Sequence, residues 1–321
     1  MQPRLNIAIK ACRVASEIIN KIYKSKDQDD LRSYDDITTV LFKHIVENIN
    51  ESYKFGDQDL LGPSNAKRDA LTNIITGDGL TDDIKKEEKI IWIINPIDSL
   101  KNFTNKLPIF NITITLMKDG VAEATVIYNP IQDYLITAIK GQGALSENKK
   151  IRTRSISQEK LLYIINDEIL SRNLCNSIDG ELRIFGSPST ELTYLALDQL
   201  DLVIYPNINI WDSAAGVLVC QESGLLLSNI NGGKDIYNEK SLIGAPTWLH
   251  KKILKKINQS WALLSAPNKK RLVLAIKIEE YVPTKIPTII AIAKYLTAMP
   301  PNKRSESKTN NVVKEVIIVR D

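Results

Sequence analysis

The first fifty residues carry apolar positions at three- and four-residue spacing. In the second of two such stretches, Ile37, Leu41 and Ile45 follow this spacing, with polar residues between them. Apolar residues spaced in this way lie on one face of an amphipathic helix. The pattern therefore predicts helices over residues 4–24 and 37–53.

The middle of the chain changes from a continuous meander to an alternation of strands and helices. The run KIIWIIN at 88–94 is short and continuously apolar, which favours a buried strand, and three further strands follow, joined at 118–120 and 129–130. After a glycine-rich turn at 141–143, strands and helices alternate. The helices predicted there span 167–175, 188–198, 212–223 and 246–257, and the strands span 161–165, 182–185, 201–205, 224–227 and 241–244. A meander followed by alternation predicts an α+β part and then an α/β part.

These patterns suggest three regions, with boundaries after 145 and after 258. Residues 1–145 form the α+β subdomain with the meander, residues 146–258 form the α/β subdomain, and residues 259–321 form a basic tail. The tail holds eleven Lys or Arg and five Asp or Glu, which leaves the first 258 residues near −2 in a chain whose net charge is +4. Its apolar stretch at 288–299 is too short to span a membrane, and Lys294 interrupts it.

Composition limits the chemistry that the chain can carry out. The chain has 321 residues, of which 43% are hydrophobic, and only two histidines and three cysteines, with no CxxC spacing. A zinc site, a Ser-His-Asp triad and a disulfide framework are therefore disfavoured. We expect a reducing, cytoplasmic location. Any reaction has to rely on carboxylates and hydroxyls.

One acid follows the buried strand in the stretch WIINPIDSLKNF, residues 92–103. Asn95-Pro96 ends the strand, so Asp98 is placed at a strand exit, where ligands often bind. Residues 99–101 can open a helical turn whose free N–H groups face an anion. The alternative is purely structural, with Asp98 as a helix cap and Asn95-Pro96 as an ordinary turn.

A second acid heads a helix in IWDSAAGVLVCQESG, residues 210–224. Asp212 precedes a stretch of small residues that favours close helix packing. Here too, a structural alternative exists, with Asp212 as an N-cap beside a core Trp211. Neither stretch decides between the alternatives by itself.

Together, however, the two stretches resemble the inositol monophosphatase superfamily of magnesium-dependent phosphatases. Its signatures are W-x-x-D-P-x-D-G-T-x-N-F and W-D-x-A-A-G, and the similarity covers residues 4 to about 258. The resemblance implies a layered αβαβα sugar-phosphatase-like fold. The matching residues are Trp92, Pro96, Asp98, Asn102 and Phe103 in the first signature, and Trp211, Asp212, Ala214, Ala215 and Gly216 in the second.

The resemblance also implies a site for Mg²⁺ and a phosphorylated small molecule. The expected metal ligands are Asp98, the carbonyl of Ile97, Asp212 and, weakly, Asn95. The groups expected to hold the phosphate are at Ser99, Leu100, Lys101, Gly186 and Ser187.

Several positions depart from the family pattern. Asn95 replaces the first acid of D-P-x-D, and Ser99 and Leu100 replace the Gly-Thr pair. Pro63 lies where a water-activating glutamate is expected, and Tyr205 where a substrate-contacting glutamate often falls. Because Mg²⁺ needs anionic oxygens, its binding should be weak. No residue remains as a confident catalytic group, since the catalytic roles are lost at Pro63 and Leu100.

We therefore predict a catalytically impaired family member, and whether it is an enzyme stays open. One rival is an active Mg²⁺-dependent phosphomonoesterase for inositol, sugar or nucleotide phosphates that recruits another acid, such as Asp57 or Asp59. Another is a regulatory role with a protein partner, as in the bacterial extragenic-suppressor branch of the family. The resemblance implies a homodimer. Nucleic acid is disfavoured as a partner, because the tail lacks interleaved aromatics and a reading motif.

Overall fold

The computed structural model describes residues 3–25, 34–52, 58–61, 90–153, 160–175 and 177–264. The chain divides into one unit over Met1–Trp261 and another over Ala262–Asp321. Almost everything described belongs to the first unit. The predicted tail from residue 265 onward lies outside the described residues, so its role stays a prediction, as do the two boundaries between the three regions.

The amino-terminal half forms a seven-stranded sheet whose strands are ordered as they occur in the chain. All neighbours pair antiparallel except β1 and β2, which are parallel. The sequence prediction found β2 to β5 but not β1, β6 and β7, which are short. The strands are β1 (Gln58–Leu61), β2 (Ile90–Asn95), β3 (Ile112–Lys118), β4 (Val121–Asn129), β5 (Tyr134–Ile139), β6 (Gly143–Ser146) and β7 (Lys149–Ile151).

The carboxyl-terminal half forms a five-stranded sheet in the order β11-β12-β10-β8-β9. Strands β8, β9 and β10 are parallel, and β12 pairs antiparallel with β10 and β11. The strands are β8 (Leu161–Ile165), β9 (Gly180–Leu182), β10 (Leu202–Tyr205), β11 (Leu226–Ser228) and β12 (Leu242–Ala245). The helices of the molecule are α1 (Pro3–Lys24), α2 (Tyr34–Ser52), α4 (Leu100–Thr104), α5 (Glu168–Leu174), α6 (Pro188–Ala196), α7 (Ile210–Ser223) and α8 (Thr247–Leu264).

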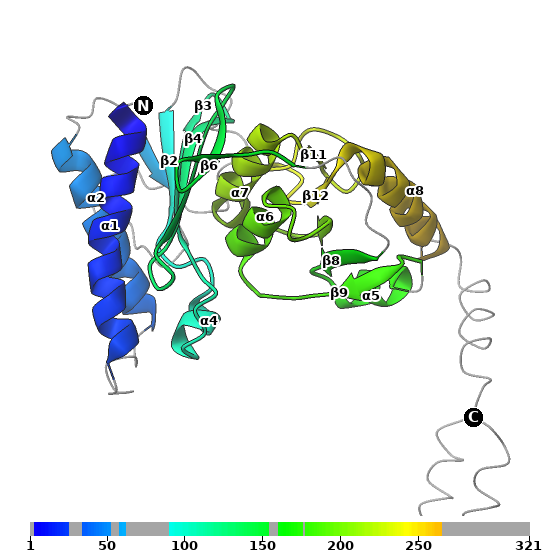
Figure 1. The fold of residues 1–321 in the computed structure, drawn as a ribbon, viewed down its shortest axis with the longest axis horizontal. Helices are drawn as coiled ribbons and strands as arrows, with labels where there is room; N and C mark the ends of the chain where they lie inside the picture. Colours follow the sequence, from blue (N-terminus) through cyan, green and yellow to red (C-terminus); the bar gives the residue numbers. More distant parts are fainter. Residues whose placement is uncertain are drawn as a thin grey trace, which may run out of the picture. The chain divides into compact units, whose positions relative to one another are not determined.

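Three apolar clusters stack these elements into five layers. The first cluster joins α1 and α2 to one face of the seven-stranded sheet through residues such as Ile19, Leu41 and Trp92. The second places α6 and α7 between the two sheets, and the third packs α5 and α8 on the outer face of the five-stranded sheet. The order of elements can be followed in Figure 1. The predicted layered αβαβα fold is thus confirmed.

Glycine at position 216 permits the close packing of the middle layer. A Cβ at this position of α7 would lie 2.4 Å from the Cβ of Leu192 on α6. Real Cβ atoms do not approach that closely, so a larger residue would push the two helices apart. Gly216 therefore has a packing role.

Among the described helices, none is long and apolar enough to cross a membrane.

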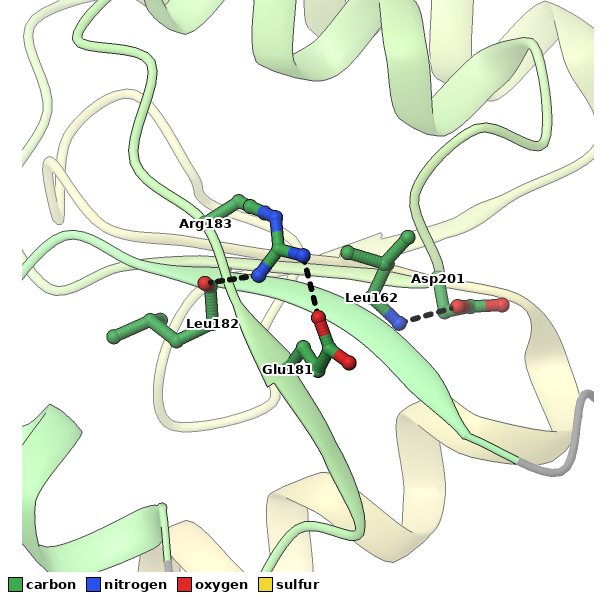
Figure 2. A network of polar contacts seen from close by, with 5 residues as sticks. All are labelled: Leu162, Glu181, Leu182, Arg183 and Asp201. Atoms are coloured by element: carbon green, nitrogen blue, oxygen red, sulfur yellow. Dashed lines mark hydrogen bonds and ion pairs between the residues drawn. The ribbon is translucent and has the colours of Figure 1, made fainter.

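Strand β9 forms one edge of the five-stranded sheet, and a pair of charged side chains lies at its end. Figure 2 shows Arg183 donating to the carbonyl of Leu182 and pairing with Glu181, while Asp201 accepts a hydrogen bond from the N–H of Leu162 in β8. Charged side chains at a sheet edge disfavour pairing with the strand of another chain. The strand predicted at 182–185 was misplaced, because β9 ends at Leu182 and the residues after it turn toward α6.

Candidate functional site

Strand β2 ends at Asn95, and the chain then turns into the short helix α4. Asn95 still pairs with Thr113 of β3, and its side chain is only 2% exposed. Ser99 is the N-cap residue of α4, although its side chain makes no capping hydrogen bond. Asp98 lies between these two, so the strand delivers it to the turn as the sequence predicts.

The carboxylate of Asp98 accepts hydrogen bonds from four protein donors. Its Oδ1 accepts from the N–H of Asn111 over 2.7 Å, and its Oδ2 accepts from the hydroxyl of Ser187 over 2.6 Å. Oδ2 also accepts from both the N–H and the hydroxyl of Ser189. Burial raises the pKa of Asp98 above its usual value, although these hydrogen bonds act in the opposite direction. Both oxygens of this carboxylate therefore already accept protein donors, and its role as a metal ligand stays a prediction.

Asp98 lies at the amino terminus of α6. Ser187 is the N-cap of this helix, and its hydroxyl oxygen accepts from the N–H of Thr190 while its hydroxyl contacts Asp98. A carboxylate is stabilised there by the free N–H groups and by the helix dipole. The side-chain amide of Asn111 contacts Ser189 and Thr190 as well, which ties the turn before β3 to α6. Asp98 therefore links the two halves of the fold.

Asp212 lies in the first turn of α7, whose N-cap is Asn209. The side-chain amide of Asn95 donates to its Oδ1 over 3.0 Å, and the amide of Asn209 approaches its Oδ2 at 3.4 Å. Burial, together with the charge of Asp98, raises the pKa of Asp212 to about 7, and the two amide donors only partly oppose this. The structure thus brings Asp212 next to Asn95, which lies 117 positions before it, and into the region of Asp98.

A third carboxylate lies close to this pair but is buried. Glu191 on α6 is 2% exposed, and its Oε1 accepts from the N–H groups of Phe185 and Gly186 over 2.8 and 2.9 Å. Its Oε2 accepts from the hydroxyl of Tyr205, which is fully buried at the end of β10. Burial raises the pKa of Glu191, and burial followed by the charge of Glu191 raises the pKa of Tyr205 well above its usual value. Tyr205 is therefore part of a closed internal network.

The remaining predicted residues are placed differently from one another. Ser187 is fully buried, and Gly186 is exposed with a positive φ of 72°. Lys101 is exposed on α4, whereas Leu100 is partly buried against the apolar cluster that joins α1 and α2 to the seven-stranded sheet. Ile97 is 5% exposed and Ser99 is 7% exposed. Pro63, as well as the acid at 57, lies outside the described residues, and for Asp59 only the backbone is described.

Comparison with known proteins identifies the family. Residues 1–262 match the inositol monophosphatase family. The chain belongs to this family. The Nus factor SuhB of Pasteurella multocida is 30% identical over 277 residues, which cover 80% of this chain and 96% of that protein. The inositol-1-monophosphatase of Mesorhizobium japonicum is 29% identical over 182 residues, covering 52% of this chain and 67% of that protein.

A solved structure supports the fold independently. The extragenic suppressor protein suhB of Bartonella henselae superposes with a TM-score of 0.66 at 24% identity, covering 80% of this chain and 98% of that one. At this identity the likeness concerns the fold alone. Inositol monophosphatase family members are generally Mg²⁺-dependent, which raises the question of whether the residues present here suit the metal.

The described residues fit a magnesium cluster poorly. Within them, no group of three or more His, Cys, Asp or Glu side chains is arranged to hold a metal ion. The oxygens of Asp98 already accept protein donors, and an amide N–H approaches Asp212 where a cation would be needed. The buried Oδ1 of Asn95 has no hydrogen-bond partner, but it is a neutral oxygen. Mg²⁺ keeps much of its hydration unless anionic oxygens replace the water.

Three residues of this region were not predicted from the sequence. Glu191, Ser189 and Asn111 contact either Asp98 or Tyr205, yet each looks like an ordinary residue of a helix or a strand edge. The only signal was the position of Glu191 in the first turn of a predicted helix, where acids are common. Nothing in the sequence indicated that this acid is buried.

Proposed function

We propose that this chain is a catalytically impaired member of the inositol monophosphatase family that can still bind a phosphorylated small molecule. The observation that supports this is the hydrogen bonding of its two remaining acids. Protein donors contact both oxygens of Asp98, and the amide of Asn95 donates to Asp212. Both carboxylates thus already have hydrogen-bond donors from the protein.

The physical reason is a lack of negative charge. By resemblance, the family site carries about four anionic ligands, and here about two remain, so two neighbouring dications are poorly compensated. Leu100 lacks a hydroxyl that could orient an attacking water. Each lost acid–base role typically costs ~10²-fold or more in rate, although such losses are not additive. The N–H groups of residues 99–101 do not depend on side-chain identity, so phosphate binding can outlast hydrolysis.

Phosphate release from a panel of inositol, sugar and nucleotide monophosphates in the presence of Mg²⁺ tests the proposal. We expect no turnover above background from the unchanged protein, and restored turnover from Asn95→Asp, Pro63→Glu and Leu100→Thr combined. A matched control carries alanine at the same three positions and should stay inactive. Calorimetric titration with Mg²⁺ should show weak binding to the unchanged protein and tighter binding to the triple reversion.

Lithium-sensitive turnover by the unchanged protein would contradict this proposal. It would support the second candidate, an active phosphomonoesterase that takes a further acid from the segment 57–59. Mutation of Asp57 and Asp59 to asparagine should then abolish the activity.

A regulatory role is a third candidate, favoured by the relatives named Nus factor SuhB. We propose a protein partner and a homodimeric state for this role, as the family resemblance suggests. Partner capture from cell extract with and without residues 259–321 tests the tail. An unchanged set of captured partners would exclude the tail from partner binding, and sedimentation of the purified protein tests the dimer.

A further inference from the structure

The final described helix, α8, has an unusual charge composition. Its 18 residues, TWLHKKILKKINQSWALL, include four lysines and no aspartate or glutamate. The chain from 247 to 321 carries 15 Lys or Arg against five Asp or Glu, a net charge of +10, whereas residues 1–246 carry 27 against 33, a net charge of −6. Positive charge is therefore concentrated at one end of the chain, starting with α8.

Packing fixes which face of α8 the lysines occupy. Leu249, Ile253 and Ile257 are buried in the cluster that joins α8 to the five-stranded sheet. Lys251, Lys252 and Lys255 are consequently exposed. They lie within about 6 Å along the helix axis, at a rise of ~1.5 Å per residue.

No acid among the described residues forms an ion pair with these three lysines. Within the part of the chain that the structure describes, none of the ion pairs found involves a lysine of α8. The ammonium of Lys252 lies 5.5 Å from the ring centre of Trp248. Lys256 differs from the other three, because its ammonium donates to the carbonyl of Ser177. The exposed lysines are thus available to an external anion.

We propose that the exposed lysine face of α8, formed by Lys251, Lys252 and Lys255, binds the phosphate backbone of a nucleic acid without reading its bases. Among residues 247–257, no large apolar side chain is among the exposed ones. A protein interface usually needs buried aromatic or aliphatic anchors, and a membrane-surface helix needs apolar side chains to insert. A polyanion held by charge alone needs neither.

The sequence prediction disfavoured nucleic acid because the residues beyond 258 lack aromatics and a reading motif. Those features matter for base recognition, but backbone binding depends on cations that neutralise phosphates. The proposal is independent of the catalytic site, since it concerns a helix on the outer face of the other sheet.

Fluorescence anisotropy with a labelled single-stranded RNA of about 20 nucleotides tests the proposal in the full-length protein over a range of salt concentrations. The test variant carries Lys251→Gln, Lys252→Gln and Lys255→Gln, since glutamine keeps helix propensity. The matched control carries Lys149→Gln, Lys150→Gln and Arg152→Gln, which removes the same charge from exposed positions at strand β7. Circular dichroism confirms that both variants fold.

We expect the unchanged protein to bind RNA, with an affinity that falls as salt rises. The test variant should lower the slope of log K against log salt by about 2, at ~0.7 for each lost phosphate contact, and should weaken binding on the order of tenfold at low salt. The control should change binding less than about threefold. A duplex DNA of equal length distinguishes a general phosphate surface from one that requires a flexible single strand.

Three results would overturn the proposal. The first is no RNA binding by the unchanged protein at low salt, and the second is an equal effect of the two variants. The third is tighter binding of poly-glutamate than of RNA at equal charge concentration, which would indicate an acidic protein instead. In the first case, binding to phosphatidylserine vesicles would indicate a membrane surface instead.

Discussion

Replacing Asn95 by aspartate tests whether an amide has taken over the role of a cation. In the native chain the Nδ2 of Asn95 lies 3.0 Å from the Oδ1 of Asp212, and the Asn95 side chain is 2% exposed. The variant removes this donor and places a second carboxylate beside Asp212. Two unit charges at that separation repel by about 5 kcal/mol at an effective dielectric constant of ~20.

The pair can avoid much of this repulsion by holding one proton between the two carboxylates. Keeping this shared proton costs free energy only when the pH exceeds the raised pKa of the pair. The pKa of Asp212 is already about 7 in the native chain. A hydrogen bond to a charged group contributes about 1.5–3 kcal/mol. We therefore expect Asn95→Asp to lower the free energy of unfolding by about 2–4 kcal/mol near pH 8, and by about half of that or less near pH 5.

Magnesium should reverse part of this loss. A ligand at a hundred times its dissociation constant stabilises the folded state by about 2.7 kcal/mol. Urea unfolding followed by circular dichroism, at both pH values and with and without Mg²⁺, measures the effect. The control is Asn102→Asp, which loses hydrogen bonds to the carbonyls of Ile109 and Phe185 and should not regain stability with Mg²⁺.

Two results would refute this reasoning. One is an Asn95→Asp variant that is as stable as the parent protein near pH 8. The other is an equal stabilisation of parent and variant by Mg²⁺. The parent site would then bind the metal as tightly as the site with the restored acid.

Three further predictions follow from the same region. Because the pKa of Asp212 is raised in the folded state, its protonated form favours folding. Its contribution to the free energy of unfolding is therefore present below about pH 4 and is lost as the pH rises through about 7. The Asp212→Asn variant should show a smaller change of unfolding free energy over this pH range. Tyr205→Phe should cost about 1–3 kcal/mol by leaving the Oε2 of the buried Glu191 without its donor. A double-mutant cycle with Glu191→Gln should show coupling, whereas additive losses would contradict the pairing. Gly216→Ala should lower the melting temperature through a clash with Leu192 that costs about 1–3 kcal/mol, and an unchanged melting temperature would show that α6 and α7 can separate freely.

The order of helices and strands was largely readable from the sequence. Long amphipathic helices such as α1, and continuous apolar runs such as β2, carry strong periodic signals because one or both faces must be buried. The short strands β6 and β7 were missed, since three or four residues are too few to establish a period. For the same reason the predicted strand at 182–185 was displaced from β9.

The candidate site was only half readable. Asp98 and Asp212 follow from local motifs, because a strand exit and a helix start are defined by neighbouring residues. Some of their hydrogen-bond partners come from elements far away in the chain: Ser189 is 91 positions from Asp98, and Asn95 is 117 positions from Asp212. Contacts of this kind depend on how the layers stack.

The sequence by itself therefore determined the family, the layered fold and the loss of acidic residues at the site, because these depend on residue type, spacing and local periodicity. Only the tertiary structure decided that Asp98 is held by protein donors, that Glu191 is buried against Tyr205 and that the lysines of α8 face outward. Those outcomes depend on which side of each element is covered by another, and burial determines whether a charged group is bound within the protein or is available to a ligand.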